Sequence, residues 1–147
     1  MFVSIILPTY NEKSNLPILT HILIEELSKP QSPISRFELI IVDDNSPDGT
    51  LAIAQKLAQV YGSDIIQVLS RSGKLGLGSA YAHGLKYARG EWIVLMDVDL
   101  SHHPKFISEM IRKQKETGAD IVTGSRYISG GGVYGWDWKR KVTRYPE

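Results

Sequence analysis

The sequence contains no cysteine, which excludes disulfide frameworks, thiolate zinc sites and cysteine nucleophiles. Its formal net charge is only +1 at pH 7, so no overall field favours nucleic acid, and we expect no nucleic-acid partner. Long hydrophobic runs are also missing. The apolar stretch Phe2–Leu7 stops at Pro8, which makes it too short for a signal peptide or a membrane span. We therefore expect any membrane contact to come from the surface or through a partner.

What the sequence does contain is an alternation of short apolar runs and helical patterns along 147 residues, enough for one domain with a core. The apolar runs predict five buried strands: Val3–Leu7, Phe37–Val42, Ile65–Leu69, Trp92–Met96 and Ile121–Val122. The helical patterns predict four helices: Leu16–Leu27, Leu51–Tyr61, Ser79–Ala88 and Pro104–Glu116. This alternation is typical of an α/β fold with a mostly parallel sheet covered on both faces. Three glycines follow helices at positions where we expect left-handed caps: Gly62, Gly90 and Gly118.

The composition changes at Ser129. Three glycines are followed there by aromatic and basic residues, namely Tyr134, Trp136, Trp138, Lys139, Arg140, Lys141 and Arg144. We therefore expect one domain over residues 1–128 and a tail rich in glycine, aromatics and bases over residues 129–147. Such rings and bases favour lipid headgroups or phosphate, although a terminal segment without partners would fray instead.

Polar residues follow the predicted strands, at the positions where doubly wound sheets bind ligands. Pro8–Glu12 could offer a ligand an aromatic face and a carboxylate, or could simply form a turn before a helix. Asp43 and Asp44 end the second strand. Because adjacent carboxylates repel each other, we expect partners for them, such as a cation or the donors of a sugar or base.

A second acidic motif, Asp97-Val98-Asp99, directly follows the apolar run Trp92–Met96. In extended backbone, residues two apart point to the same side, so both carboxylates can reach one ion. Hard oxygen ligands suit Mg²⁺ or Mn²⁺, which also bind phosphate oxygens and water. His102 and His103 suggest a zinc or iron site as an alternative. Adjacent residues rarely point at one ion, however, and a place at the start of the next helix suits them better.

Three basic residues accompany these carboxylates. Arg71 and Lys74 lie in a glycine-rich segment between a strand and a helix, where they either neutralise phosphate or stay solvated. This segment is neither a Walker A loop nor a G-x-G-x-x-G fingerprint, which disfavours a nicotinamide oxidoreductase. Arg126 follows the fifth predicted strand and either binds phosphate or lies on the surface.

Taken together, these motifs resemble family 2 glycosyltransferases of the GT-A fold. The resemblance rests on Leu7–Glu12, Val42–Thr50, Lys74–Gly78, Met96–Pro104 and Gly124–Tyr127. Within the family, Asp97–Pro104 and Gly131–Asp137 are similar to the branch that transfers mannose to dolichyl phosphate.

The resemblance implies GDP-mannose as donor, dolichyl phosphate as acceptor, Mg²⁺ or Mn²⁺ as cofactor, and direct displacement with inversion. The residues implied to line the guanosine end are Pro8, Tyr10, Glu12, Val42 and Asp44. Asp97, Val98 and Asp99 would hold the metal and the sugar diphosphate, with Asp97 and Asp99 as metal ligands and catalytic residues, and Arg126 would contact phosphate. The family resemblance also implies a peripheral place on the cytoplasmic face of the endoplasmic reticulum membrane, with small membrane-embedded subunits as partners.

Two features depart from the family pattern. Val98 replaces the usual alanine, and its backbone can still make the same contacts. After Lys141 the family continues with a Ser-Arg-Gly-Ala-Asn-like stretch and acceptor-binding residues, whereas this sequence has Val142–Glu147. We therefore expect a chain shortened at its C-terminus, with little mannosyl transfer on its own. Two alternatives are a catalytically inactive nucleotide-sugar-binding fragment and a family 2 transferase with another donor sugar.

Overall fold

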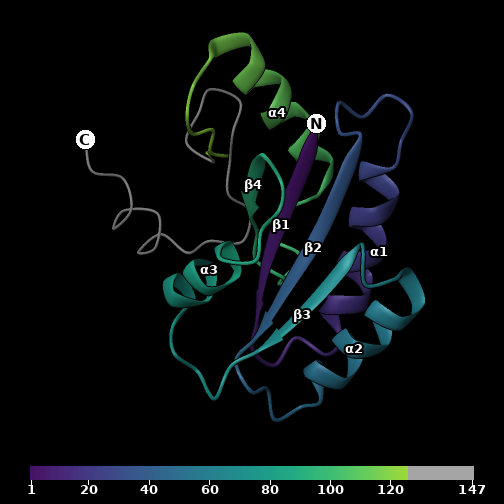
Figure 1. Cartoon of the computed structure of the whole chain (residues 1–147), viewed down its shortest axis with the longest axis vertical. Coiled ribbons are helices and arrows are strands. Elements are labelled where there is room, and N and C mark those ends of the chain that lie inside the picture. Colours follow the sequence, from purple (N-terminus) through teal and green to yellow (C-terminus); the bar gives the residue numbers. More distant parts are fainter. Residues whose placement is uncertain (126–147) are drawn as a thin grey trace, which may run out of the picture.

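The computed structural model describes residues 1–125, which form one sheet with helices on both sides (Figure 1). The strands are β1 (Phe2–Thr9), β2 (Arg36–Asp43), β3 (Ile66–Ser70) and β4 (Trp92–Leu95). The helices are α1 (Asn15–Leu27), α2 (Thr50–Tyr61), α3 (Leu77–Leu85) and α4 (Lys105–Thr117). The strands are ordered β3-β2-β1-β4, and every pair is parallel. The predicted α/β fold with a mostly parallel sheet is confirmed.

Each face of the sheet has its own hydrophobic core. Successive strand residues point to opposite faces, so Ile5 of β1 packs with residues of α1, α2 and α4, whereas Ile6 packs with Ile40, Val42 and Ala80 of α3. Figure 1 accordingly shows α1 and α2 on one side of the sheet and α3 on the other. Because both faces are covered, β1 and β2 need apolar residues at nearly every position, which explains their continuous hydrophobic runs.

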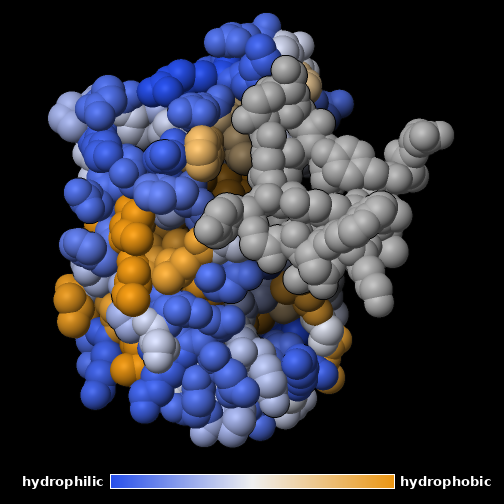
Figure 2. Space-filling model, turned by 180° about the vertical axis from the view of Figure 1, so that it is seen from behind, coloured by the Kyte–Doolittle hydropathy of each residue, from blue (hydrophilic) through white to orange (hydrophobic). Residues whose placement is uncertain are grey.

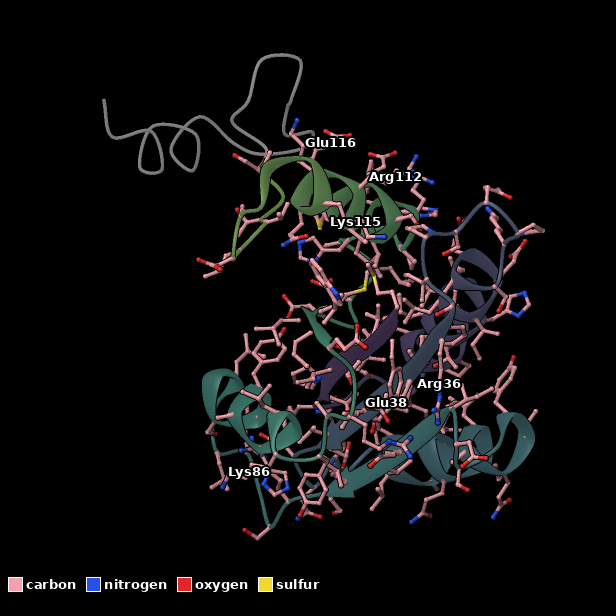
Figure 3. The ribbon with its side chains drawn as sticks, turned by 45° about the horizontal axis from the view of Figure 1, so that its top comes forward. Arg36, Glu38, Lys86, Arg112, Lys115 and Glu116 are labelled. Atoms are coloured by element: carbon pink, nitrogen blue, oxygen red, sulfur yellow. The ribbon has the colours of Figure 1, made fainter. Side chains whose placement is uncertain are left out.

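A charged side chain of β2 is completely buried between the strands and the segment that follows α3. Glu38 of β2, labelled in Figure 3, accepts hydrogen bonds from Ser4 Oγ of β1 at 2.6 Å and from Gln67 Nε2 of β3 at 2.8 Å. The Arg89 backbone N–H and Nε both donate to it at 2.7 Å. Burial raises the pKa of Glu38, but these hydrogen bonds outweigh burial and hold the pKa below its ordinary value. The cluster therefore ties three strands to the segment that follows α3.

The predicted fifth strand is wrong. Residues 119–125 form no regular secondary structure, and the Ile121 side chain is 80% exposed. An apolar pair such as Ile121–Val122 shows that a segment is suited to a strand, but a strand also needs a hydrogen-bonded neighbour, which local sequence does not reveal.

The predicted left-handed caps are only partly correct. Gly118 ends α4 with φ 66° and ψ 16°, as expected. Gly62 has a positive φ but an extended ψ of 145°, so it is not a left-handed cap. α3 already ends at Leu85, and Gly90 has a different role. A Cβ atom at Gly90 would lie 2.6 Å from the backbone nitrogen of Ser4, so the close approach of two chain segments requires glycine there.

The exterior mixes polar and apolar residues. In Figure 2, seen from behind, hydrophilic residues cover most of the top of the molecule, and hydrophobic residues form a patch at mid-height, left of the centre. Ile18 of α1 and Val60 of α2 are half exposed or more. Among residues 1–125, no helix combines the length and hydrophobicity that crossing a membrane requires.

Candidate functional site

Three sharp turns mark one edge of the sheet. Because the strands are parallel, β1, β2 and β4 all end at this edge. Each is followed by a non-glycine residue with positive φ: Asn11 at 61°, Asn45 at 57° and Leu100 at 62°. This conformation is tolerated by asparagine and is rare for a bulky residue such as leucine. Strained backbone of this kind concentrates at functional sites, so this edge is the candidate site.

Hydrogen bonds join the turns after β1 and β2. The Asn11 backbone N–H donates to Ser46 Oγ at 3.0 Å, and the Glu12 N–H donates to Thr50 Oγ1 at 3.0 Å. The Glu12 carboxylate accepts a hydrogen bond at 2.8 Å from Nδ2 of Asn15, the first residue of α1. The two loops therefore form one structural unit, and Glu12 is held at its surface.

Asp43 has its partners inside the protein. Its Oδ1 accepts hydrogen bonds from Thr9 Oγ1 at 2.9 Å and from Ser46 Oγ at 2.6 Å, and its side chain is fully buried. The expectation that Asp43 needs an external cation or sugar is therefore wrong. Ser46, close to it in the chain, and Thr9 of β1 donate the hydrogen bonds that stabilise the buried carboxylate.

Asp44 is paired with Arg71. The Arg71 Nε donates to Oδ1 at 2.6 Å, Nη2 donates to Oδ2 at 2.6 Å, and the Leu75 backbone N–H also reaches Oδ2 at 3.2 Å. The two side chains are only 6% and 8% exposed. The sequence left two alternatives for Arg71, phosphate binding and solvation, and both are wrong. Its guanidinium is occupied by Asp44 and anchors the segment between β3 and α3. Its Nη1 also donates to Ser79 Oγ in α3 at 2.8 Å.

The other residues predicted to line the nucleoside end lie nearby and differ in exposure. Pro8 and Val42 are paired in register across β1 and β2. The Val42 side chain is fully buried in the core under α3, so only its backbone faces a potential ligand. Tyr10 is 37% exposed, and Lys74 Nζ lies 4.3 Å from the centre of its ring. This contact is a cation–π interaction between the segment before α3 and the turn after β1.

The acidic motif after β4 alternates between core and surface. Val98 is 2% exposed and belongs to the core that α1, α2 and α4 cover, whereas Asp97 is half-buried and Asp99 is exposed. Neither carboxylate is buried in the core, but residues 98–100 form bends and not the extended backbone on which the prediction of a shared side rested, and Asp99 Oδ1 accepts a hydrogen bond from the Ser101 N–H at 2.9 Å. Asp97 Oδ1 accepts a hydrogen bond from Tyr81 Oη of α3 at 2.8 Å. Burial raises the pKa of Tyr81, and the hydrogen bond to Asp97 and the nearby charge of Asp99 raise it further. Tyr81 is therefore a protonated donor at neutral pH.

The described residues contain no group of three or more histidine, aspartate or glutamate side chains that could hold a metal alone. His103 Nδ1 accepts a hydrogen bond from the Lys105 backbone N–H at 3.2 Å, which places it at the start of α4. The alternative zinc site is therefore absent from residues 1–125. Asp97 and Asp99 provide two hard oxygen donors, which suit a cation that also binds phosphate oxygens.

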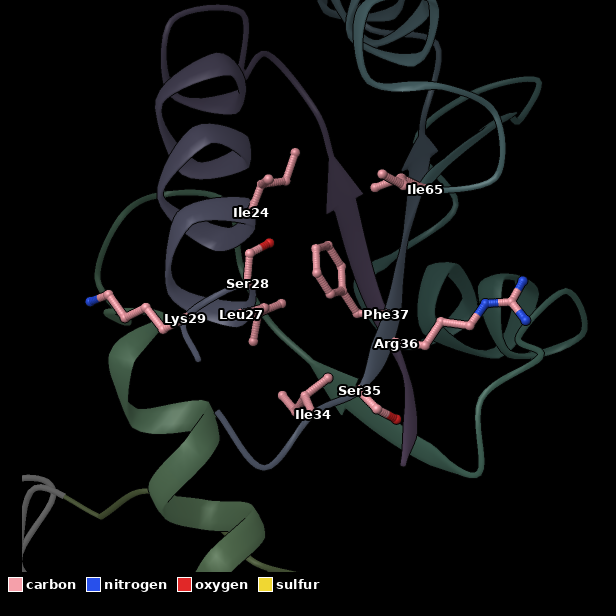
Figure 4. A pocket seen from close by; sticks show the side chains of 9 residues that line it. All are labelled: Ile24, Leu27, Ser28, Lys29, Ile34, Ser35, Arg36, Phe37 and Ile65. Atoms are coloured by element: carbon pink, nitrogen blue, oxygen red, sulfur yellow. The ribbon is translucent and has the colours of Figure 1, made fainter. Parts of the chain in front are cut away.

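A cavity lies away from this edge of the sheet. A space of about 390 Å³ lies at the opposite edge of the sheet, between the end of α1 and the beginnings of β2 and β3 (Figure 4). Its lining includes Leu27, Ile34, Phe37 and Ile65 and no carboxylate. We do not assign it to the reaction. The predicted site residue Arg126, the domain boundary after residue 128 and the tail 129–147 lie outside the described residues.

Residues 4–147 match the model of glycosyl transferase family 2. The chain belongs to this family. It is 41% identical over 145 residues to a dolichol-phosphate mannosyltransferase of Pyrococcus furiosus, a match that covers 97% of this chain and 38% of that protein. It is 38% identical over 141 residues to a polyprenol monophosphomannose synthase of Mycolicibacterium smegmatis, covering 94% of this chain and 50% of that protein. This family 2 chain thus spans half or less of the length of these relatives.

Solved structures agree on the fold. The mannosyltransferase PcManGT from Pyrobaculum calidifontis, in complex with GDP-Man and Mn²⁺, matches with a TM-score of 0.61 and 26% identity, over 76% of this chain and 32% of that one. S. aureus TarS 1-349 in complex with UDP matches with a TM-score of 0.60 and 28% identity, over 82% of this chain and 34% of that one. The family 2 chain therefore has the fold of nucleotide-sugar transferases.

Proposed function

We propose that this chain carries the donor-binding part of an enzyme that transfers mannose from GDP-mannose to a polyprenyl phosphate, with dolichyl phosphate as the acceptor. The supporting observation is the pair Asp97 and Asp99 at the sheet edge that also holds Asp44, in a chain similar to proteins named for this chemistry. The similarity to a transferase bound to UDP supports one alternative, a different donor nucleotide.

On this proposal, Asp97 and Asp99 hold a Mg²⁺ or Mn²⁺ ion together with the diphosphate of the donor. Two carboxylates plus phosphate oxygens and water are a usual ligand set for either cation. When bound, the cation acts as a Lewis acid and neutralises the charge on the departing GDP. The backbone of Val98 lies between the two ligands, and Arg126 adds a phosphate contact.

The guanosine would lie over the turns after β1 and β2. Tyr10 offers a partly exposed ring, and Glu12 a carboxylate at the surface of the same loop. Three of the roughly four acceptor positions of the Asp44 carboxylate are already used, which leaves one for a donor on the base or ribose. Pro8 and Val42 contribute backbone shape rather than side-chain contacts.

The acceptor needs little activation. A phosphate monoester is anionic at neutral pH, so positioning matters more than a general base. One of its oxygens attacks the anomeric carbon of mannose, and the bond from that carbon to the diphosphate oxygen breaks with its electron pair, releasing GDP. Attack opposite the leaving group inverts the centre and gives a β-linked mannosyl phosphate.

The acceptor's isoprenoid tail places the reaction at a bilayer. We include in the proposal a peripheral location on the cytoplasmic face of the endoplasmic reticulum, with small membrane-embedded subunits as partners. Flotation of the chain with liposomes, with and without such subunits, tests this part separately from donor binding.

Calorimetric titration of the 147-residue chain with GDP-mannose tests the donor site. We expect binding that requires Mn²⁺ or Mg²⁺, competition by GDP but not by UDP, and a loss of at least about tenfold in affinity for Asp97→Asn or Asp99→Asn, since each removes a charged ligand. Asp64→Asn, an exposed aspartate at the other end of the sheet, is the matched control.

Metal-independent binding, or equal affinity in the two site variants and the control, would refute the donor site. Competition by UDP alone would instead support the alternative donor. Transfer of labelled mannose to dolichyl phosphate in detergent is a separate measurement; donor binding without transfer would support the inactive nucleotide-sugar-binding alternative.

A further inference from the structure

Helix α3 reaches the acidic motif through one side chain. Tyr81 lies in the second turn of α3 and is half-buried beside Ala80, which packs in the core on Ile6 and Val42. Its hydroxyl donates to Asp97 Oδ1 at 2.8 Å. The ring is thus anchored by packing, while the hydroxyl contacts the acidic motif.

Asp97 itself has little local support. β4 ends at Leu95, the Met96 backbone N–H still donates to Ile6 O at 3.2 Å, and residues 98–100 form bends that include the left-handed Leu100. An aspartate outside regular structure can adopt several side-chain rotamers. The bond from Tyr81 occupies Oδ1 and restricts the side-chain rotamer, while Oδ2 has no hydrogen bond within residues 1–125.

We propose that Tyr81 is a positioning residue that presents Asp97 Oδ2 to the divalent cation of the donor complex. The inference deepens the proposed function and rests on it. Carboxylates that bind metals are commonly oriented by a second hydrogen bond, and loss of that bond typically lowers metal affinity about ten- to a hundredfold. If Tyr81 had only a structural role, it would act through its ring alone, and phenylalanine would replace it without loss of metal affinity.

The test compares Tyr81→Phe with Tyr87→Phe in the 147-residue chain. Tyr87 follows the same helix, is 46% exposed, and contacts the ring of His83 at 5.4 Å between centroids. Free Mn²⁺ is measured by electron paramagnetic resonance during titration in the presence of GDP-mannose. We expect Tyr81→Phe to raise the Mn²⁺ concentration at half-saturation by about tenfold. Saturating Mn²⁺ should restore its affinity for GDP-mannose to within about twofold of the wild type, and Tyr87→Phe should match the wild type throughout.

The outcomes separate two failures. If the wild-type chain shows no metal-dependent binding of GDP-mannose, the proposed function fails and the role of Tyr81 fails with it. If the wild type binds but Tyr81→Phe has the same Mn²⁺ dependence as Tyr87→Phe, only the positioning role is overturned. A Tyr81→Phe variant that loses thermal stability, and whose affinity for GDP-mannose does not recover at saturating Mn²⁺, would also overturn it, because the residue would then be structural.

Discussion

Arg71 and Asp44 form a buried, two-point ion pair across 27 residues of sequence, with both nitrogen–oxygen distances at 2.6 Å. The pair joins the end of β2 to the segment that enters α3. Because Arg71 also donates to Ser79 Oγ, the same guanidinium fixes the start of the helix that carries Tyr81. The ion pair therefore supports the proposed nucleoside side of the site and, through α3, its proposed metal side.

Removal of Arg71 should destabilise the fold strongly. We expect Arg71→Ala to lower the free energy of unfolding by about 3 kcal/mol, since it leaves Asp44 as a buried, uncompensated charge. Arg71→Lys should cost less, because it keeps the charge but loses the planar fork. Urea unfolding followed by circular dichroism measures both. Arg112→Ala, at an exposed arginine of α4 (Figure 3), should stay within about 0.5 kcal/mol of the wild type, and an equal loss in Arg71→Ala and Arg112→Ala would contradict the structural role.

Glu38 should make stability depend on acid pH. Its pKa in the folded state lies below the ordinary 4.5, so folding favours the ionised form. The resulting stabilisation is complete above the unfolded-state pKa and is lost as the pH falls through the lower, folded-state pKa. We expect Glu38→Gln to cost about 2 kcal/mol at pH 7, because its amide N–H₂ would face the donors of Arg89 or Gln67.

Urea unfolding of wild type and Glu38→Gln between pH 7 and pH 3 measures this effect. The difference in the free energy of unfolding between the two proteins should shrink as the pH falls below 4.5, the ordinary pKa of glutamate. Glu109→Gln, at an exposed glutamate of α4, should show no such change and serves as the control. A difference that is constant over the whole range would show that Glu38 acts by packing and not by charge.

Gly90→Ala should be far more harmful than Gly73→Ala. A Cβ at Gly90 would meet the Ser4 backbone nitrogen at 2.6 Å and the Ser4 Oγ at 2.8 Å, and backbone cannot give way cheaply. We expect a loss of about 3 kcal/mol, at the upper end of the usual cost of overpacking. At Gly73 nothing lies within 4 Å, so alanine should be tolerated there. Thermal unfolding compares the two variants. Similar midpoints would show that the backbone at Gly90 lies far enough from Ser4 in solution to accept a Cβ atom.

The parts of this molecule that could be predicted are those encoded locally. The runs around Ile5, Ile40 and Val94 identified β1, β2 and β4, and parallel order then brought the residues after them to one edge. Arg71 was misjudged because a basic residue in a glycine-rich loop is as consistent with phosphate binding as with an ion pair. Its partner lies 27 residues earlier, and no local pattern joins them.

Two further residues escaped the sequence analysis for the same reason. Glu38 lies within an apolar strand, which was a signal in itself, since a buried carboxylate requires several donors. Those donors come from three other segments of the chain. Tyr81 belonged to a predicted helix as an ordinary aromatic residue, and only the packing of α3 on the sheet brings its hydroxyl to Asp97.

Finally, the two halves of the candidate site should be energetically coupled through α3. Ser79 and Tyr81 are two residues apart in this helix; Ser79 bonds to Arg71 beside Asp44, and Tyr81 bonds to Asp97. Loss of one of these hydrogen bonds should shift α3 and thereby weaken the other hydrogen bond. We expect the effects of Ser79→Ala and Tyr81→Phe on Mn²⁺-dependent GDP-mannose binding to be non-additive by at least about 0.5 kcal/mol in a double-mutant cycle. A parallel cycle of Ser79→Ala with Tyr87→Phe should be additive, since Tyr87 makes no contact with the acidic motif among the described residues. Additivity in both cycles would show that the nucleoside and metal sides of the site act independently.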